Sequence, residues 1–149
     1  MKKFLLDENL GKLAKWLRFL GYDAAIYKKI SVNNKIRLAN REKRIYLTRD
    51  KKTAKLKKKF SRILIKSENY KEQLKELKGH IEFDEAKLFT VCPHCNRKLK
   101  ATTKEKVEKL IPEYIYQTHD EFMVCYFCGR VFWKGTHYQK ILNTLKKIF

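Results

Sequence analysis

Phe4-Leu-Leu-Asp-Glu-Asn-Leu10 is the stretch from which the architecture of this chain can be worked out. Three apolar residues that end at an acid predict a short buried strand. Apolar residues then recur at steps of three and four, as on one face of a helix, and Gly21 suits the end of that helix. These apolar positions are Leu10, Leu13, Ala14, Leu17 and Leu20. A strand followed directly by a helix predicts the first half of a β-α-β unit.

The same alternation continues to about residue 78. Further strands are predicted at 24–27, 45–47 and 63–65, and further helices at Ser31, after Asp50 and at Asn69. Short, uniformly apolar strands that alternate with helices are typical of an α/β fold, a parallel sheet with helices on both faces. We therefore predict an α/β domain over residues 1–78, a connector over 79–90, and a small C-terminal unit with a final helix over 91–149.

Four cysteines define the C-terminal unit. They form the pairs Cys92-Pro-His-Cys95 and Cys125-Tyr-Phe-Cys128, with 29 residues between the pairs. Two such knuckles can supply the tetrahedral four-sulfur shell of a zinc ribbon. The alternatives are two disulfides or redox-active pairs. Four thiolates leave no position for water, so we expect Zn²⁺ to be structural, and His94 is not needed as a ligand.

The charge of the chain is strongly positive. Lys and Arg number 36 against 16 acidic residues, a net charge of +20, and the densest basic stretch is Lys51–Arg62. Such a charge favours a polyanionic partner, nucleic acid first and an anionic membrane surface second, although a lysine-rich stretch can also be a solvated helix face. No apolar run has the length of a membrane span or of a signal-peptide core. We expect a cytoplasmic protein with reduced thiols.

Two acidic residues are expected at one edge of the sheet. Asp7 follows the first strand and Asp50 the third, and ligands of parallel sheets bind at the carboxyl ends of strands. Asn34, at the start of the second helix, and Ser67, after the fourth strand, belong to the same edge. Converging carboxylates in a basic domain predict Mg²⁺ or Mn²⁺ that activates water against a phosphodiester. The alternative is that each Asp only caps a helix.

Several motifs resemble the Mut-seven C-terminal RNase domain family, in the same order along nearly the whole chain. They are the stretch 4–23, Ile45-Tyr-Leu-Thr-Arg-Asp50, both knuckles, His119-Asp-Glu-Phe122 and Gly135-Thr-His-Tyr138. The resemblance implies a PIN-like nuclease fold with a zinc ribbon, a divalent metal at the sheet edge and ribonuclease activity. The resemblance matches Asp7 and Asp50 to two acidic residues of the family. The chain departs at Asn33 and Asn34, where family members usually carry an acidic pair, and an amide binds a hard cation less strongly.

These observations together predict an RNA-binding, metal-dependent ribonuclease. Asp7 and Asp50 would hold the ion, with Asn34 and Ser67 as accessory groups. Basic side chains near this edge are expected to contact RNA phosphates: Lys12, Lys15, Arg18, Arg49, Lys51, Lys52 and Lys55. The alternative, favoured by the two asparagines, is a non-catalytic module that binds RNA or a ribonucleoprotein particle. A DNA-binding regulator is disfavoured, because no helix-turn-helix is evident. His137 is a candidate acid/base, although a structural hydrogen bond is the commoner role.

Overall fold

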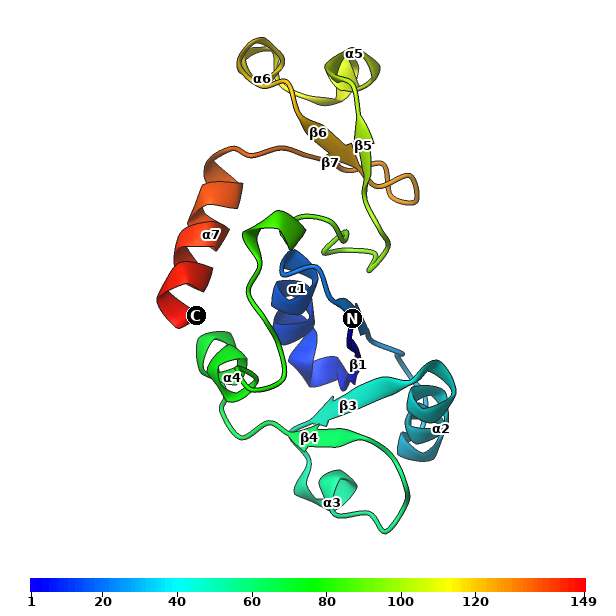
Figure 1. The fold of residues 1–149 in the computed structure, drawn as a ribbon. Helices are drawn as coiled ribbons and strands as arrows, with labels where there is room; N and C mark the ends of the chain where they lie inside the picture. The colour runs from blue at the N-terminus through cyan, green and yellow to red at the C-terminus, as the bar shows by residue number, and fades with distance from the viewer.

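A four-stranded parallel sheet forms the centre of the N-terminal part, in a computed structural model that describes residues 1–149 (Figure 1). Its strands are β1 (Lys3–Leu6), β2 (Asp23–Ala25), β3 (Arg44–Thr48) and β4 (Arg62–Leu64), in the order β2-β1-β3-β4. Leu5 of β1 pairs with Ala25 on one side and with Tyr46 on the other. The predicted parallel sheet is confirmed. Because β2 and β3 lie on opposite sides of β1, the direction of winding reverses between β1 and β3.

Helices cover both faces of this sheet, as predicted. One face carries α1 (Gly11–Phe19), α4 (Tyr70–Glu76) and α7 (Thr136–Ile148); the other carries α2 (Val32–Glu42) and the segment after α3 (Lys51–Ala54). Side chains alternate along β1, so that Phe4 and Leu6 join the larger core cluster and Leu5 joins the smaller one. The fold of the N-terminal part is therefore mixed α/β.

Local signals in the sequence set the ends of several helices. Ser31 Oγ accepts a hydrogen bond from the Asn34 N–H (3.1 Å) at the start of α2, and Asn69 Oδ1 accepts one from the Glu72 N–H (3.0 Å) at the start of α4. Gly21, after α1, has φ +95°, and a Cβ there would lie 2.7 Å from the Lys87 carbonyl oxygen. Glycine is therefore required at this position by both backbone conformation and space.

The C-terminal part contains a separate three-stranded antiparallel sheet. Its strands are β5 (Lys100–Thr102), β6 (Phe122–Val124) and β7 (Val131–Phe132), and the insertion between β5 and β6 forms α5 (Lys104–Val107) and α6 (Glu113–Thr118). Short 3₁₀ turns complete the secondary structure: η1 (Glu8–Leu10), η2 (Glu85–Lys87) and η3 (Glu108–Leu110). Phe122 and three residues of the insertion, Val107, Ile111 and Ile115, form a small core. Figure 1 shows this unit beyond the end of α1, apart from the larger sheet.

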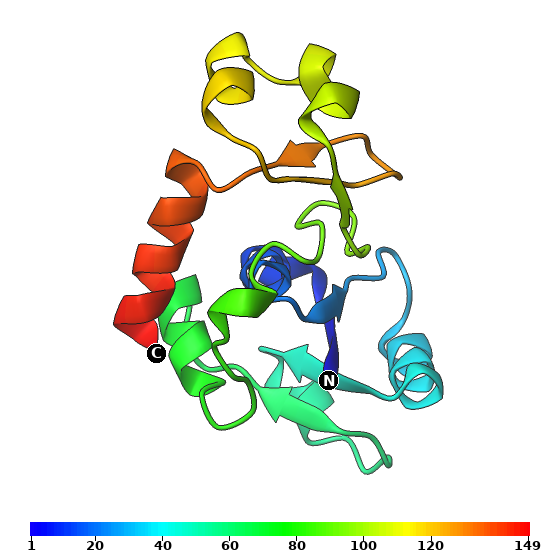
Figure 2. The same ribbon diagram turned by 45° about the horizontal axis from the view of Figure 1, so that its top comes forward.

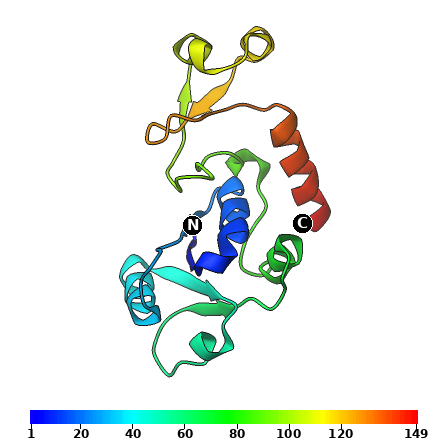
Figure 3. The same ribbon diagram turned by 180° about the vertical axis from the view of Figure 1, so that it is seen from behind.

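The last helix leaves the small sheet and packs on the α/β domain. Figure 2 and Figure 3 both show α7 beside α4. Five residues of α7 are buried in the larger core cluster: Tyr138, Ile141, Leu142, Leu145 and Ile148. Ile81, Leu88 and Phe89, from the segment that the sequence predicts to be a connector, are buried in the same cluster. No helix combines the length and apolar character that a bilayer span requires.

The first knuckle is docked on the edge strand β2. The Ala24 N–H donates to Asn96 Oδ1 (2.8 Å), and Asn96 Nδ2 donates to Asp23 Oδ1 (2.6 Å). Arg18 of α1 bridges the two parts, since its Nε donates to the Ala24 oxygen and its Nη1 to the Pro93 oxygen, both at 2.9 Å. An edge strand presents unpaired backbone groups. At Ala24, Asn96 of the knuckle accepts from the N–H, and Arg18 donates to the carbonyl oxygen. The ribbon is thereby joined to the sheet by specific hydrogen bonds.

Candidate metal centre and nucleic-acid interface

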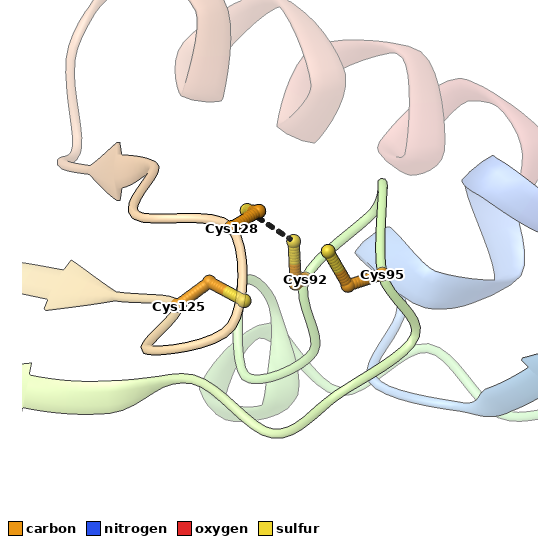
Figure 4. Close-up of side chains that lie close together, drawn as sticks. All are labelled: Cys92, Cys95, Cys125 and Cys128. Carbon is orange, nitrogen blue, oxygen red and sulfur yellow. Dashed lines mark hydrogen bonds between the residues drawn. The ribbon is translucent and has the colours of Figure 1, made fainter.

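The four cysteine sulfurs converge at the junction of the two knuckles (Figure 4). All four Sγ atoms lie within 4.8 Å of one another, and Cys92 Sγ lies 3.8 Å from Cys128 Sγ. None of the cysteines forms a disulfide. Four thiolates around one zinc ion at about 2.3 Å lie about 3.8 Å apart, which is the separation of the Cys92 and Cys128 sulfurs. The residues therefore fit the predicted structural zinc site.

The two knuckles repeat one backbone turn. In each, the N–H of the first cysteine donates to the carbonyl oxygen of the arginine five residues later, and the residue after the second cysteine has positive φ. The pairs are Cys92 with Arg97 (2.7 Å) and Cys125 with Arg130 (2.9 Å), and the positive-φ residues are Asn96 (58°) and Gly129 (79°). Burial opposes the Cys128 thiolate, but hydrogen bonds from Arg130 and the neighbouring thiols lower the pKa of Cys128 to about 6. Both turns aim their sulfurs at one point.

The two predicted acids follow neighbouring strands at the carboxyl edge of the sheet. Thr48, the last residue of β3, connects them: its Oγ1 donates to Asp7 Oδ2 (2.6 Å) and accepts from the Asp50 N–H (3.0 Å). The β1–β3 pairing places this arrangement where the winding of the sheet reverses, the usual place for a ligand in an open α/β sheet. Thr48 was not predicted as a site residue.

Donors occupy both oxygens of Asp7. Besides Thr48 on Oδ2, Asp7 Oδ1 accepts from the Tyr46 hydroxyl (2.6 Å) and from Lys35 Nζ (3.0 Å). The Lys35 side chain is only 9% exposed, and its Nζ lies 4.0 Å from Glu8 Oε1. Burial and the Asp7 carboxylate raise the pKa of Tyr46, which keeps the phenol a donor. An ammonium group therefore lies beside the carboxylate to which a metal ion was expected to bind.

Lys35 is the main site residue that the sequence reasoning missed. It lies on the same side of α2 as the buried residues Ile36 and Ala39. A charged residue within the apolar stripe of a helix needs a partner in the interior, and this was the available signal. Tyr46, in the middle of a predicted strand, carried no comparable signal.

Asp50 caps a helix. Its carboxylate accepts from Thr53 Oγ1 (2.6 Å), the Lys52 N–H (3.2 Å) and the Thr53 N–H (3.3 Å), at the start of α3. These hydrogen bonds, that of the Thr53 hydroxyl first, lower the pKa of Asp50. Capping, one of the two roles considered from sequence for this residue, is the role seen in the structure.

The arrangement does not fit a divalent cation. Asp7 already accepts three hydrogen bonds, one of them from an ammonium group, and the Asp50 carboxylate is turned into α3. Asn34 is exposed beside a shallow pocket with Arg37 and Arg41, and no hydrogen bond joins its side chain to Asp7 or Asp50. The Ser67 N–H donates to Glu76 Oε2 (2.9 Å), so Ser67 is joined to α4 and does not contact Asp7. The structure therefore does not bring Asn34 and Ser67 to the two acids.

The predicted phosphate-binding residues fall into two groups. Lys12, Lys51, Lys52 and Lys55 are exposed, and Arg49, at the end of β3, has a buried Nε–H without a partner. Arg18 is used in docking the knuckle, and Lys15 on the same helix is partly buried. The exposed lysines thus retain donors for an anion, whereas the Arg49 Nε–H is shielded from solvent. His137 lies edge-on to Phe89 and Phe19, which is consistent with packing.

A cleft separates the first knuckle from the α/β domain. Its volume is about 690 Å³, and its charged lining consists of Glu8, Arg18, Asp23, Lys28, Arg44 and Arg97. Asp23 is paired with Arg44 (2.7 Å), which leaves Arg18, Lys28 and Arg97 as basic groups without an acidic partner. Glu8 follows Asp7 in sequence, and Arg97 belongs to the first knuckle. The cleft therefore leads from the carboxyl edge of the sheet to the four-cysteine cluster.

The fold and the cysteine cluster define a class of α/β proteins that carry a small four-cysteine module able to hold a metal ion. A family model described as the Mut7-C RNAse domain matches residues 2–145, essentially the whole chain. The chain therefore belongs to this family, and the resemblance found in the sequence is confirmed. No curated protein and no solved structure matches the chain.

Proposed function

We propose that this protein binds RNA on the basic surface around the carboxyl edge of its sheet and the adjoining cleft. Its family is an RNase domain family, for which RNA is substrate or partner. The observation that carries the proposal is the set of exposed cations beside the Asp7–Asp50 edge, in a chain of net charge +20. The parallel sheet with helices on both faces supports a PIN-like fold. The positive charge would also favour binding to a ribonucleoprotein particle.

Binding without metal-dependent cleavage is the form of this function that the site geometry favours. A hard cation requires several oxygen ligands with available lone pairs. Lys35 neutralises Asp7 from within the protein, while Asp50 is engaged at the start of α3. The side chains that remain available at this edge are cations, which bind phosphate.

A metal-dependent ribonuclease is the second candidate, because the family match and the Thr48 bridge between Asp7 and Asp50 favour it. In this alternative, Asp7 and Asp50 would hold Mg²⁺ or Mn²⁺, which would activate water for phosphodiester hydrolysis. It would require Lys35 to leave Asp7.

RNA binding is tested by fluorescence anisotropy with a labelled single-stranded RNA over a series of salt concentrations. We expect log affinity to fall linearly with log salt, and the triple substitution Lys51→Gln, Lys52→Gln, Lys55→Gln to reduce the slope by about 2 if each lysine contacts a phosphate. The matched control substitutes Lys140, Lys146 and Lys147, exposed on α7, with glutamine and should leave the slope nearly unchanged. Absence of binding by the wild-type protein would refute the proposal.

Cleavage is tested on the same RNA with Mg²⁺, Mn²⁺ or a chelator, comparing the wild-type protein with Asp7→Asn. We expect no metal-stimulated cleavage that distinguishes the two proteins. Cleavage that requires the metal and disappears in Asp7→Asn would establish the second candidate in place of the first.

A further inference from the structure

Two neighbouring aromatic side chains stand exposed on the second knuckle. Tyr126 and Phe127, between the zinc ligands Cys125 and Cys128, are 71% and 68% exposed. Neither ring belongs to a hydrophobic core cluster, so neither is needed to hold the ribbon together. Large aromatic side chains that are exposed to water outside any core are characteristic of binding surfaces.

The surroundings of these rings are basic. The Arg97 guanidinium carbon lies 4.0 Å from the centre of the Phe127 ring, and Arg130 follows the knuckle. Because Phe127 remains largely exposed, Arg97 covers only part of it. Arg97 also lines the cleft that leads to the sheet edge, so the aromatic rings lie where the cleft reaches the ribbon.

The zinc centre would make this surface rigid. The backbone of Tyr126 and Phe127 lies between two metal ligands and is closed by the Gly129 N–H donating to the Cys125 oxygen (2.7 Å). A chain segment fixed in this way loses little further backbone entropy when a ligand binds.

We propose that Tyr126 and Phe127 form a stacking platform for unpaired bases of single-stranded RNA. This inference rests on the proposed RNA binding. Bases stack on aromatic side chains whatever their sequence, and arginines beside the platform can contact phosphates. In a duplex the faces of the bases are covered by their neighbours, so the platform selects single strands. The platform lies on the ribbon and not at the edge of the sheet. It binds bases by stacking, whereas the lysines at the sheet edge bind phosphates by charge.

The test compares a labelled single strand of about 12 nucleotides with a duplex of the same length, in the salt range where binding is measurable. Tyr126→Ala and Phe127→Ala should each weaken single-strand binding by about 5-fold to 100-fold. Duplex binding should change less than about twofold, and the salt slope should not change, because no charge is removed. Tyr126→Phe and Phe127→Tyr, which keep an aromatic ring, should bind like the wild-type protein.

Two controls separate stacking from loss of structure. Each variant should contain as much zinc as the wild-type protein, and Tyr114→Ala should have no effect, since Tyr114 is 68% exposed on α6 with no cation over its ring. Unchanged single-strand affinity in Tyr126→Ala and Phe127→Ala would overturn the platform and leave RNA binding intact. Failure of the wild-type protein to bind either RNA would overturn both proposals.

Discussion

At the residue scale, Lys35 determines the character of the acidic site. A buried ammonium group is costly unless it is paired, and here Asp7 and, at longer range, Glu8 are its partners. Lys35 in turn neutralises the charge of Asp7, whose side chain is only 18% exposed. Each group therefore makes the burial of the other tolerable, and the site carries its own cation.

Replacing Lys35 with alanine should expose the carboxylate to other cations. We expect Lys35→Ala to lower the free energy of unfolding by about 1 to 3 kcal/mol, because Asp7 loses its ionic partner but keeps two hydroxyl donors. The variant should also bind Mn²⁺ more strongly than the wild-type protein, because the competing ammonium group is gone, as measured by electron paramagnetic resonance. The control Lys35→Ala, Asp7→Asn should not bind Mn²⁺. Equal Mn²⁺ binding by the wild-type protein at this edge would show that Lys35 is no obstacle.

Tyr46 provides a test of the same network through pH. Its pKa is raised by burial and by Asp7, so the folded state favours the neutral phenol, and the associated stability is lost as pH rises above the ordinary tyrosine pKa of about 10. Tyr46→Phe should be less stable than wild type by about 2 kcal/mol near neutral pH. The difference should shrink above about pH 10, as measured by urea unfolding at each pH. A difference that stays constant through this range would contradict the assigned network.

At the element scale, α7 stabilises the α/β domain, because its buried side chains pack in the core of that domain. Leu145 is completely buried in the core cluster that contains Phe4 and Leu74, while Lys146 beside it is exposed. The helix is thus part of the larger core although it follows the ribbon in sequence.

Leu145→Ala should lower the free energy of unfolding by about 2 to 5 kcal/mol, because it leaves a cavity against α4. Lys146→Ala, on the exposed side of the same helix, should change it by less than about 0.5 kcal/mol. Urea denaturation followed by circular dichroism measures both. Similar values for the two variants would show that α7 does not contribute to the core as described.

At the scale of the whole molecule, Asn96 is one of the residues that join the ribbon to the sheet. This residue has φ 58° and bonds both to the Ala24 N–H and to Asp23. Glycine takes the equivalent place in the second knuckle with φ 79°. Asn96→Gly therefore removes the two docking contacts of this side chain, while the turn that positions the cysteines can still form.

We expect Asn96→Gly to retain zinc but to lose protection at β2. Hydrogen exchange of the Ala24 amide should become faster by at least about tenfold, because its acceptor is removed. The amide of Leu5, inside the sheet, should exchange as in the wild-type protein and serves as the internal reference. An unchanged rate at Ala24 would indicate that other contacts hold the two parts together.

Much of this fold follows from local signals. The spacing of apolar residues predicts the strands and helices, Ser31 and Asn69 begin their helices as expected, and the edge shared by Asp7 and Asp50 follows from strand direction alone. The CxxC pairs predict the four-sulfur cluster, because each knuckle fixes the geometry of its own two ligands. Each of these signals is carried by residues that are close in sequence.

The tertiary structure decided what depends on packing between distant segments. Which residue of α2 meets Asp7 is set by the rotation of that helix, and burial of Ile36 and Ala39 turns Lys35 toward the acid while Asn34 faces solvent. The apolar face of α7 could have covered either unit, and the larger core provides the greater apolar area. Periodicity shows that one face of a helix will be buried, but it does not show which other segment covers that face. The packing of distant segments decides this, and it thereby decides whether a carboxylate lies beside a metal ion or beside a lysine.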